Sequence, residues 1–214
     1  MKTWRLTLRL MARDWRSGEL LLLTLAVMLT VAAVTAVGSF TDRIQQAMQR
    51  QGGELIAADL LLDASTPLPA EFGQRALSQG LSTAKTLEFS SVVLGEEGPQ
   101  LVQVKAVSPD YPLRGRLLVN DRQGAAASEI TRGPSPGEIW VEPRLLTLLN
   151  GELGMRLRLG EAEFRIAGLL EYEPDRGARL FQLAPRVMLA LADIPGTSLV
   201  TPASRVRHRL LIAS

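Results

Sequence analysis

An uncharged run near the amino terminus constrains this chain more than any other feature. No charged residue occurs between Leu20 and Thr41, a stretch of 22 residues. A helix rises about 1.5 Å per residue, so a run of this length spans the ~30 Å hydrocarbon core of a bilayer. We therefore predict a transmembrane helix over residues 20–41.

The charges that flank this run predict its orientation. Residues 1–19 carry five Lys and Arg against two acidic residues, whereas only Arg43 and Arg50 follow closely. Cationic segments favour the cytoplasmic side of a membrane. We expect residues 1–19 to form a cytoplasmic leader and the rest of the chain to be exported.

A cleaved signal peptide is the competing interpretation, because Ala36-Val37-Gly38 has the small residues of a cleavage site. The apolar region of a signal peptide usually has about 7–15 residues and follows a shorter charged region than this one. The length of both segments favours an uncleaved membrane anchor.

The leader also has the spacing of an amphipathic helix, with cations and aromatic residues recurring every three or four positions. Such a helix lies along a membrane surface with its cations toward the phosphate headgroups and its tryptophans at the interface. The alternative is that the leader serves only as a signal that sets the orientation of the membrane helix. The candidate membrane-interface residues are Trp4, Arg5, Arg9, Arg13, Trp15 and Arg16.

Two further features concern the predicted helix. Ala32 and Ala36 lie one turn apart, so they are candidate positions for close packing by another helix. The helical periodicity continues past the bilayer as an amphipathic extension over residues 42–55. Gly52-Gly53 is expected to end this helix.

The exported part has the pattern of an α+β fold. Short apolar runs bounded by Gly and Pro predict strands, and a proline at the start of an apolar periodic segment predicts a helix. The expected elements are a strand at 58–65, a helix at 70–79, a hairpin turning at 96–98, a helix at 143–150 and a hairpin turning at 160–161.

The last residues alternate between arginine and largely apolar side chains, which predicts a half-buried strand. Arg205, Arg207 and Arg209 share one face, and His208 lies on the other as an ordinary strand residue. We expect the cationic face to be a solvated sheet surface.

The sequence offers little for catalysis or for binding of nucleotides, metals or nucleic acids. Glycine-rich phosphate loops and the common hydrolase motifs are absent, there is no cysteine, and the single histidine has no readable partner. The net charge is +2 for the whole chain and +3 for residues 1–19, so residues 20–214 have net charge −1 and lack a basic surface for nucleic acid. We expect neither an enzyme nor a cofactor.

The acidic pairs Glu161/Glu163 and Glu171/Glu173 could in principle act as paired carboxylates of a glycosidase. Because they lie near predicted turns, we expect them to be solvated instead.

Several motifs in a fixed order resemble a known family. They are RDWRSGEL before the apolar run and FTDRI after it, then VKAVSPDYPLRG, GEIWVEPRLL, LLEYEPDRG, LAPRVMLALADIPGTSL and SRVRHRLL. Together they resemble the amino-terminal part of bacterial ABC-transporter permeases of the FtsX-like, MacB-type class. The similarity is greatest to large permeases encoded beside an ABC ATPase and a periplasmic lysophospholipase/thioesterase.

This resemblance implies an architecture and a location. In the bacterial inner membrane, one transmembrane helix would precede a two-lobed, MacB-like periplasmic core. The first, βαβ-like lobe would comprise residues 56–108 and 203–214 and be incomplete, and residues 109–202 would form an inserted, mainly β lobe.

The resemblance also implies a function. A separate cytoplasmic ABC ATPase would drive motion through the membrane helix to the periplasmic domain, for export or membrane extraction of hydrophobic compounds. Membrane lipids, a periplasmic lysophospholipase/thioesterase and a second copy of the chain are the other expected partners, and nucleic acid is not.

The family pattern includes at least three further membrane helices, which these 214 residues lack. We therefore expect a fragment of a permease, or a chain that needs the remainder supplied separately. A stand-alone, single-span periplasmic binding or adaptor protein is the alternative.

Overall fold

The computed structural model describes residues 19–95, 98–121, 126–176, 184–201 and 204–214, and within these ranges the side chains of 19, 20, 44–55 and 95 are left aside. The chain divides into two units, Met1–Arg50 and Gln51–Ser214, and each is considered by itself.

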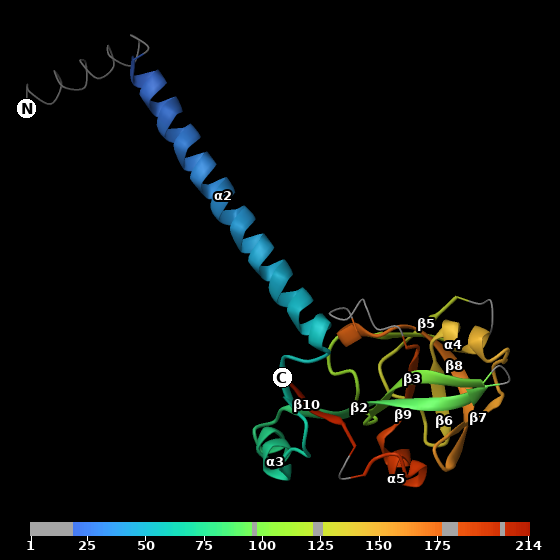
Figure 1. Ribbon diagram of the computed structural model, residues 1–214. Coiled ribbons are helices and arrows are strands. Elements are labelled where there is room, and N and C mark those ends of the chain that lie inside the picture. The colour runs from blue at the N-terminus through green and yellow to red at the C-terminus, as the bar shows by residue number, and fades with distance from the viewer. Residues whose placement is uncertain (1–18, 96–97, 122–125, 177–183, 202–203) are drawn as a thin grey trace, which may run out of the picture. The chain divides into compact units, whose positions relative to one another are not determined.

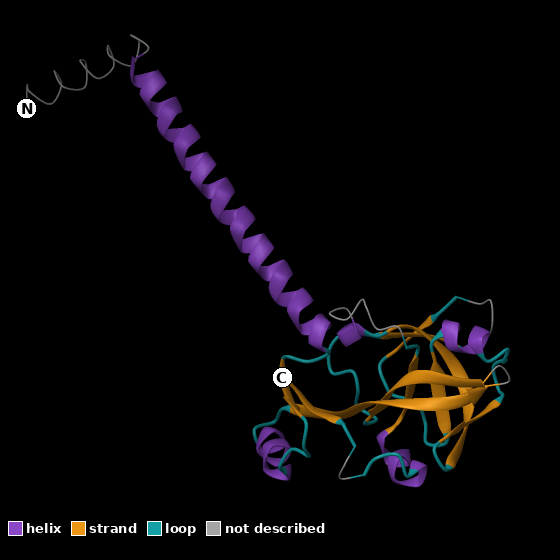
Figure 2. Cartoon of the chain, in the orientation of Figure 1, coloured by secondary structure: helices purple, strands orange, loops and turns teal. Residues whose placement is uncertain are grey.

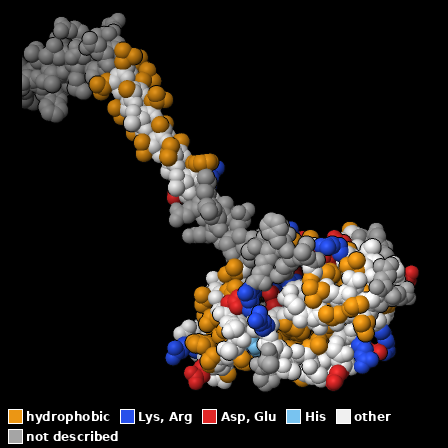
Figure 3. Space-filling model, viewed as in Figure 1, with side chains coloured by type: hydrophobic (Ala, Val, Ile, Leu, Met, Phe, Trp, Pro, Cys, Tyr) orange, Lys and Arg blue, Asp and Glu red, His pale blue; other side chains and the backbone are white. Residues whose placement is uncertain are grey.

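Helix α2, Glu19–Ile56, is a single helix of 38 residues. Its segment Leu21–Arg43 is long and apolar enough to cross a membrane, with a mean hydropathy of 2.4 and none of its most apolar window buried in the protein. Figure 3 shows hydrophobic side chains along this segment, with charged ones only at its far end. The hydroxyls of Thr30 and Thr35 donate to the carbonyls of Ala26 and Val31, so they are satisfied inside the helix. These features confirm the predicted apolar helix.

The prediction that Gly52-Gly53 ends this helix is wrong. α2 continues through both glycines to Ile56, and the left-handed turn falls on Ala57, with φ of 57°. A glycine inside a helix costs only about 1 kcal/mol, which packing can offset. Here Ala57 and Ala58 are fully buried, so the core of the domain determines where the helix stops.

Ten strands form one sheet in the described part of residues 51–214 (Figure 1). The strands are β1 Leu60–Ala64, β2 Ser82–Gly95, β3 Gly98–Val107, β4 Leu117–Asn120, β5 Ser128–Ile130, β6 Glu138–Val141, β7 Arg156–Leu159, β8 Ala162–Tyr172, β9 Arg186–Ala190 and β10 Arg207–Ala213.

The remaining elements are short helical segments that lie around the sheet (Figure 2). They are α3 Ala70–Ser78, α4 Pro143–Leu148, α5 Ile194–Thr197 and the 3₁₀ turns η1 Pro174–Arg176 and η2 Leu191–Asp193. The helices and hairpins expected from the sequence are thus confirmed, apart from the residues of the first turn, 96–97, which lie outside the described part.

The order of the strands is β1-β10-β2-β3-β9-β6-β8-β4-β5, with β7 beside β8. The last strand, β10, lies between β1 and β2 and is antiparallel to both. The pairs β3/β9 and β6/β8 are parallel, and the other neighbouring strands are antiparallel. The sheet is therefore mixed, and its first strand is held by its last.

Alternate residues of the central strands belong to two separate cores. Val104 lies opposite Phe89 on β2 and Val187 on β9, and all three are buried in the larger apolar cluster with α4, β7 and β8. The next residue along β3, Lys105, points to the opposite face, as successive residues in a strand do. On that face a smaller apolar cluster contains Val107 and Met188.

The fold class, an apolar amino-terminal helix followed by an α+β domain, is confirmed. Strands from 56–108, 109–202 and 203–214 all join the same sheet. The division of these ranges into two lobes stays a prediction.

Candidate functional site

A network of charged side chains lies inside the domain, on the face of β3 that carries Lys105. The strands β2, β3, β9 and β10 each contribute to it, and the turn η1 and the loops beside it contribute the rest. We call it the buried network; its members are Glu88, Lys105, Tyr111, Glu173, Asp175, Arg186 and Arg209.

Lys105 is the centre of this network, and its side chain is completely inaccessible to solvent. Its ammonium donates to Tyr111 Oη at 2.8 Å, Glu173 Oε1 at 3.0 Å and Asp175 Oδ1 at 2.5 Å. An ammonium has three N–H donors, and all three are used. The lysine is therefore fully satisfied, and it holds the segment around η1 against the sheet.

Two arginines extend the network to neighbouring strands. Arg209 on β10 donates from Nη1 to Glu88 Oε1 at 3.0 Å and from Nε to Asp63 Oδ2 at 3.1 Å. Arg186 on β9 donates from Nη2 to Glu173 Oε1 at 3.0 Å. Strand β10 is thus bound to its neighbours β1 and β2 through side chains as well as through backbone hydrogen bonds.

The charges of the buried network balance. Three cations, Lys105, Arg186 and Arg209, meet the three carboxylates of Glu88, Glu173 and Asp175. Buried charges are tolerated when they are paired and hydrogen-bonded in this way.

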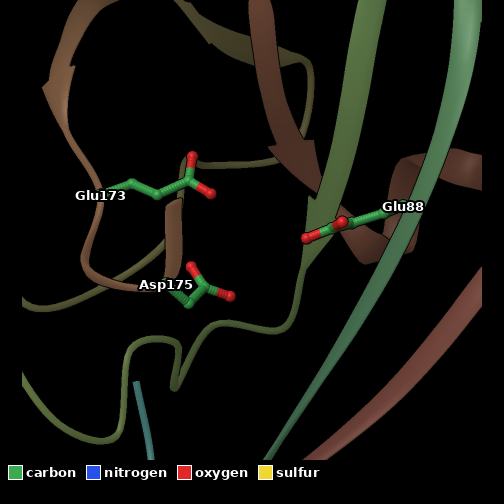
Figure 4. Close-up of side chains that lie close together, drawn as sticks. All are labelled: Glu88, Glu173 and Asp175. Atoms are coloured by element: carbon green, nitrogen blue, oxygen red, sulfur yellow. The ribbon is translucent and has the colours of Figure 1, made fainter. Parts of the chain in front are cut away.

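The Glu88 carboxylate comes from β2, and those of Glu173 and Asp175 come from the segment at η1 (Figure 4). One oxygen of each lies within 4.8 Å of the others. This spacing would suit a metal ion, but cationic side chains already contact all three carboxylates. An added divalent ion would leave a surplus of positive charge in a buried place. The arrangement fits an internal ion-pair network, not a metal centre.

The surroundings shift the pKa values of two members of the network. Burial, and then the charges of Asp175 and Glu173, raise the pKa of Tyr111 well above its usual value, so the phenol stays protonated and donates to Asp175 Oδ1. Burial by itself would raise the pKa of Asp175, but the Lys105 charge and the hydrogen bonds outweigh burial, and the pKa is lowered.

Four buried side-chain nitrogen and oxygen atoms in the described part of the chain have no hydrogen-bond partner within the protein. They are Thr86 Oγ1, Glu173 Oε2, and Nε and Nη1 of Arg186. Three of the four belong to Glu173 and Arg186 of the buried network, so these two side chains have unused hydrogen-bonding capacity, whereas the Lys105 ammonium has none.

A second, exposed group of contacts surrounds the place where the chain leaves α2. The carbonyl of Ala57 accepts from the backbone N–H groups of Leu113 and Arg114. Arg114 also binds the Asp59 carboxylate through two hydrogen bonds, of 2.9 and 2.8 Å. The Asp59 carboxylate in turn accepts from the backbone N–H of Ser214. We call these residues the exit clasp, because they tie the end of α2 to the end of β10.

The exit clasp is held by weaker electrostatics than the buried network. The side chains of Arg114 and Asp59 are 39% and 43% exposed, so water screens their attraction. The hydrogen bond from Arg114, followed by that from Ser214, lowers the pKa of Asp59. The ion pair of the clasp therefore adds little stability.

The residues singled out from the sequence have different outcomes. The six candidate interface residues of the leader lie outside the described residues. Ala32 and Ala36 are exposed on α2, and their packing against another helix stays a prediction. His208 is a strand residue of β10, as expected, and burial lowers its pKa.

Two of the surface assignments are wrong. Arg209 was expected on a solvated face, yet its side chain is only 9% exposed, because the acidic side chains of β1, β2 and η1 meet it there. Glu173 was expected to be solvated near a turn, yet its side chain is fully buried, because η1 folds it onto Lys105. Glu171 is exposed, as expected.

Five members of the buried network were not predicted from the sequence: Glu88, Lys105, Tyr111, Asp175 and Arg186. One signal was present: Lys105 lies in a strand, LVQVKAV, in which every other residue except Gln103 is apolar. A lysine in such a strand needs a buried acidic partner.

Comparisons with known proteins agree on one family. The model of the MacB-like periplasmic core domain matches residues 20–210. The uncharacterized ABC transporter permease YbbP of Escherichia coli K12 is 39% identical over 197 residues, which cover 92% of this chain. The chain spans about a quarter of that relative's length, 24%.

A solved domain assigned to a permease of Porphyromonas gingivalis also matches, with 16% identity and a TM-score of 0.41. The match covers 65% of this chain and 61% of that domain.

Replacing Lys105 should destabilise the domain severely. In a Lys105→Met variant, Glu173 and Asp175 lose their central cation while remaining buried, and breaking a buried pair in this way costs about 3–5 kcal/mol. Lys85→Met is the matched control, since Lys85 is exposed and such substitutions usually change stability by less than about 0.5 kcal/mol. Denaturant unfolding of the detergent-solubilised chain measures both; equal stability of the two variants would contradict the role of Lys105.

Acid should weaken the buried network through Asp175. Because the pKa of Asp175 is lowered from its ordinary value of 3.8, its contribution is complete above that pH and is lost as the pH falls through the folded-state pKa. We expect an Asp175→Asn variant to be less stable than the parent at pH 7, with the difference narrowing below about pH 4. A difference in unfolding free energy that stays constant down to pH 2 would contradict this assignment.

Proposed function

Because this chain belongs to the MacB-like periplasmic core domain family, we propose that it is the membrane-anchored amino-terminal portion of an ABC-transporter permease. In this proposal, α2 crosses the inner membrane with its amino end in the cytoplasm, and the domain over residues 51–214 lies in the periplasm. A separate ABC ATPase supplies the driving force from the cytoplasm.

The observation that carries the proposal is the continuity of α2. One helix runs from Glu19 to Ile56, so a membrane-compatible segment and the first residues of the domain belong to the same element. A helix transmits displacement along its axis better than a flexible linker does, since its backbone hydrogen bonds run along that axis.

The exit clasp and the buried network extend this route into the domain. Motion that reaches Ala57 passes to the loop at Arg114 through two backbone hydrogen bonds, and Asp59 adds two hydrogen bonds from the Arg114 side chain. Asp59 also connects this place to the end of β10 through Ser214. β10 is tied to β2 and η1 by Arg209. We therefore propose that β10 carries movement from the helix exit to the centre of the sheet.

The proposed output is export, or extraction from the membrane, of hydrophobic compounds. The motif resemblance supports this output, together with a periplasmic lysophospholipase/thioesterase, membrane lipids and a second copy of the chain as further partners. The permease name of the E. coli relative supports the partnership with an ATPase.

Co-purification tests the proposal. We expect a complete permease that begins with this sequence to retain a co-expressed ABC ATPase during purification. We also expect it to increase the rate at which that ATPase hydrolyses ATP. The Arg114→Ala variant of this permease should still bind the ATPase but increase ATP hydrolysis less, because the substitution removes only the side-chain contacts of the exit clasp. A complete permease that retains no ATPase would refute the proposal and favour the alternative, a single-span binding or adaptor protein.

Cysteine labelling tests the orientation. The sequence has no cysteine, so each introduced cysteine is unique. In spheroplasts, a membrane-impermeant maleimide should label a Ser78→Cys variant, since Ser78 is exposed on α3, and should label a Thr3→Cys variant only after permeabilisation. The reverse pattern would mean that the domain faces the cytoplasm.

A further inference from the structure

A cavity of about 210 Å³ lies between α3 and the strands β2 and β10. Most of its lining is apolar, including Leu68, Leu87, Leu191 and Leu210. For comparison, a dry apolar cavity of about 150 Å³ is large enough to bind benzene. The cavity beside α3 therefore has room for an aromatic ring or a short alkyl chain.

The glycine in the middle of α3 keeps this cavity open. Gly73 is buried, lines the cavity and has an ordinary helical backbone. A Cβ atom at this position would meet only Leu210 Cδ1, at 4.0 Å, which is a normal contact. Neither backbone strain nor close packing requires glycine here, although alanine would favour the helix. What glycine provides at this position is empty space.

The cavity has a cationic side. Lys85 on β2 lies directly opposite Leu210 on β10, so its side chain emerges on the same face as α3 and the cavity. Lys85 is exposed, and no ion pair involves it among the described residues. His208 lines the cavity opposite Leu87, and burial lowers its pKa, so Lys85 supplies the positive charge at neutral pH.

We propose that this cavity binds a small amphipathic anion, with its apolar group beside Gly73 and its carboxylate at Lys85. The reasons are the apolar lining, the vacant space at a glycine that the backbone does not need, and an unpaired cation at the rim. Lys85 and Glu88 of the buried network lie three positions apart on β2, so their side chains point to opposite faces of the sheet. Arg209 of the network also lines the cavity, but its guanidinium is bound to Asp63 and Glu88. The proposed site is independent of the proposed role in an ABC transporter.

Three probes of equal length separate the contributions of shape and charge: 3-phenylpropionate, 3-phenylpropanol and 3-phenylpropylamine. Binding to the full chain in nanodiscs is measured by saturation-transfer NMR and titration calorimetry, with empty nanodiscs as the blank. We expect the carboxylate to bind about two- to fivefold more tightly than the alcohol, as one exposed ion pair allows, and the amine to bind most weakly.

Two substitutions locate the site. Gly73→Leu places a side chain in the cavity and should abolish binding of all three probes, whereas Lys85→Met should lower the affinity for the carboxylate to that for the alcohol. Gly73→Ala is the milder variant: it should weaken binding and raise the melting temperature, because alanine fills space and favours the helix.

Two results would overturn the proposal. One is that none of the three probes binds the parent chain above the nanodisc blank. The other is binding that Gly73→Ala and Gly73→Leu leave unchanged, which would place the probe elsewhere. Because neither result involves an ATPase, they are distinguishable from a failure of the proposed transport function.

Discussion

The sheet depends on a lysine ammonium that has no access to water. Lys105 cannot be buried unless three acceptors reach it, and Tyr111, Glu173 and Asp175 supply them from segments 6, 68 and 70 residues away along the chain. Leaving a buried charge unpaired costs several kcal/mol, a large fraction of the stability of a domain. The loop around Tyr111 and the turn η1 therefore have one favourable position, against the sheet. Apolar packing alone would specify that position less sharply, because dispersion and hydrophobic contacts are not directional.

The same network explains how β10 holds β1 in the sheet. β1 is short and pairs with β10 alone among the described strands. β10 meets acidic side chains on both sides through Arg209, at Asp63 of β1 and at Glu88 of β2. The ion pairs of Arg209 and the backbone hydrogen bonds thus favour the same register of β1, β10 and β2. A slip of one residue would turn Arg209 to the other face and leave Glu88 short of a cation.

Sequence reasoning succeeds where the determining interactions are local. The apolar length of α2, the prolines at the starts of α3 and α4, and the alternation in β7, β8 and β10 each act within a few residues. The Glu88–Lys105 pair was within reach too, because a hairpin that pairs Gly95 with Gly98 also pairs Glu88 with Lys105, counting back along both strands. Glu173, Asp175 and Arg186 could not be placed, since their partners depend on the order of strands in the sheet. Gly52-Gly53 misled for a related reason: buried Ala57 and Ala58, not local propensity, end the helix.

The buried network and the exit clasp divide two tasks between two kinds of ion pair. Lys105 and Glu173 are fully buried, so their attraction is strong and breaking it exposes an uncompensated charge. Water screens the attraction between Arg114 and Asp59, so breaking this ion pair costs little free energy and the pair can form again. If α2 transmits motion to the domain, as proposed, the domain needs a body that does not deform and a joint that can shift without unfolding it. The distribution of burial places the rigid contacts at the centre of the sheet and the adjustable ones at the end of α2, where movement would enter.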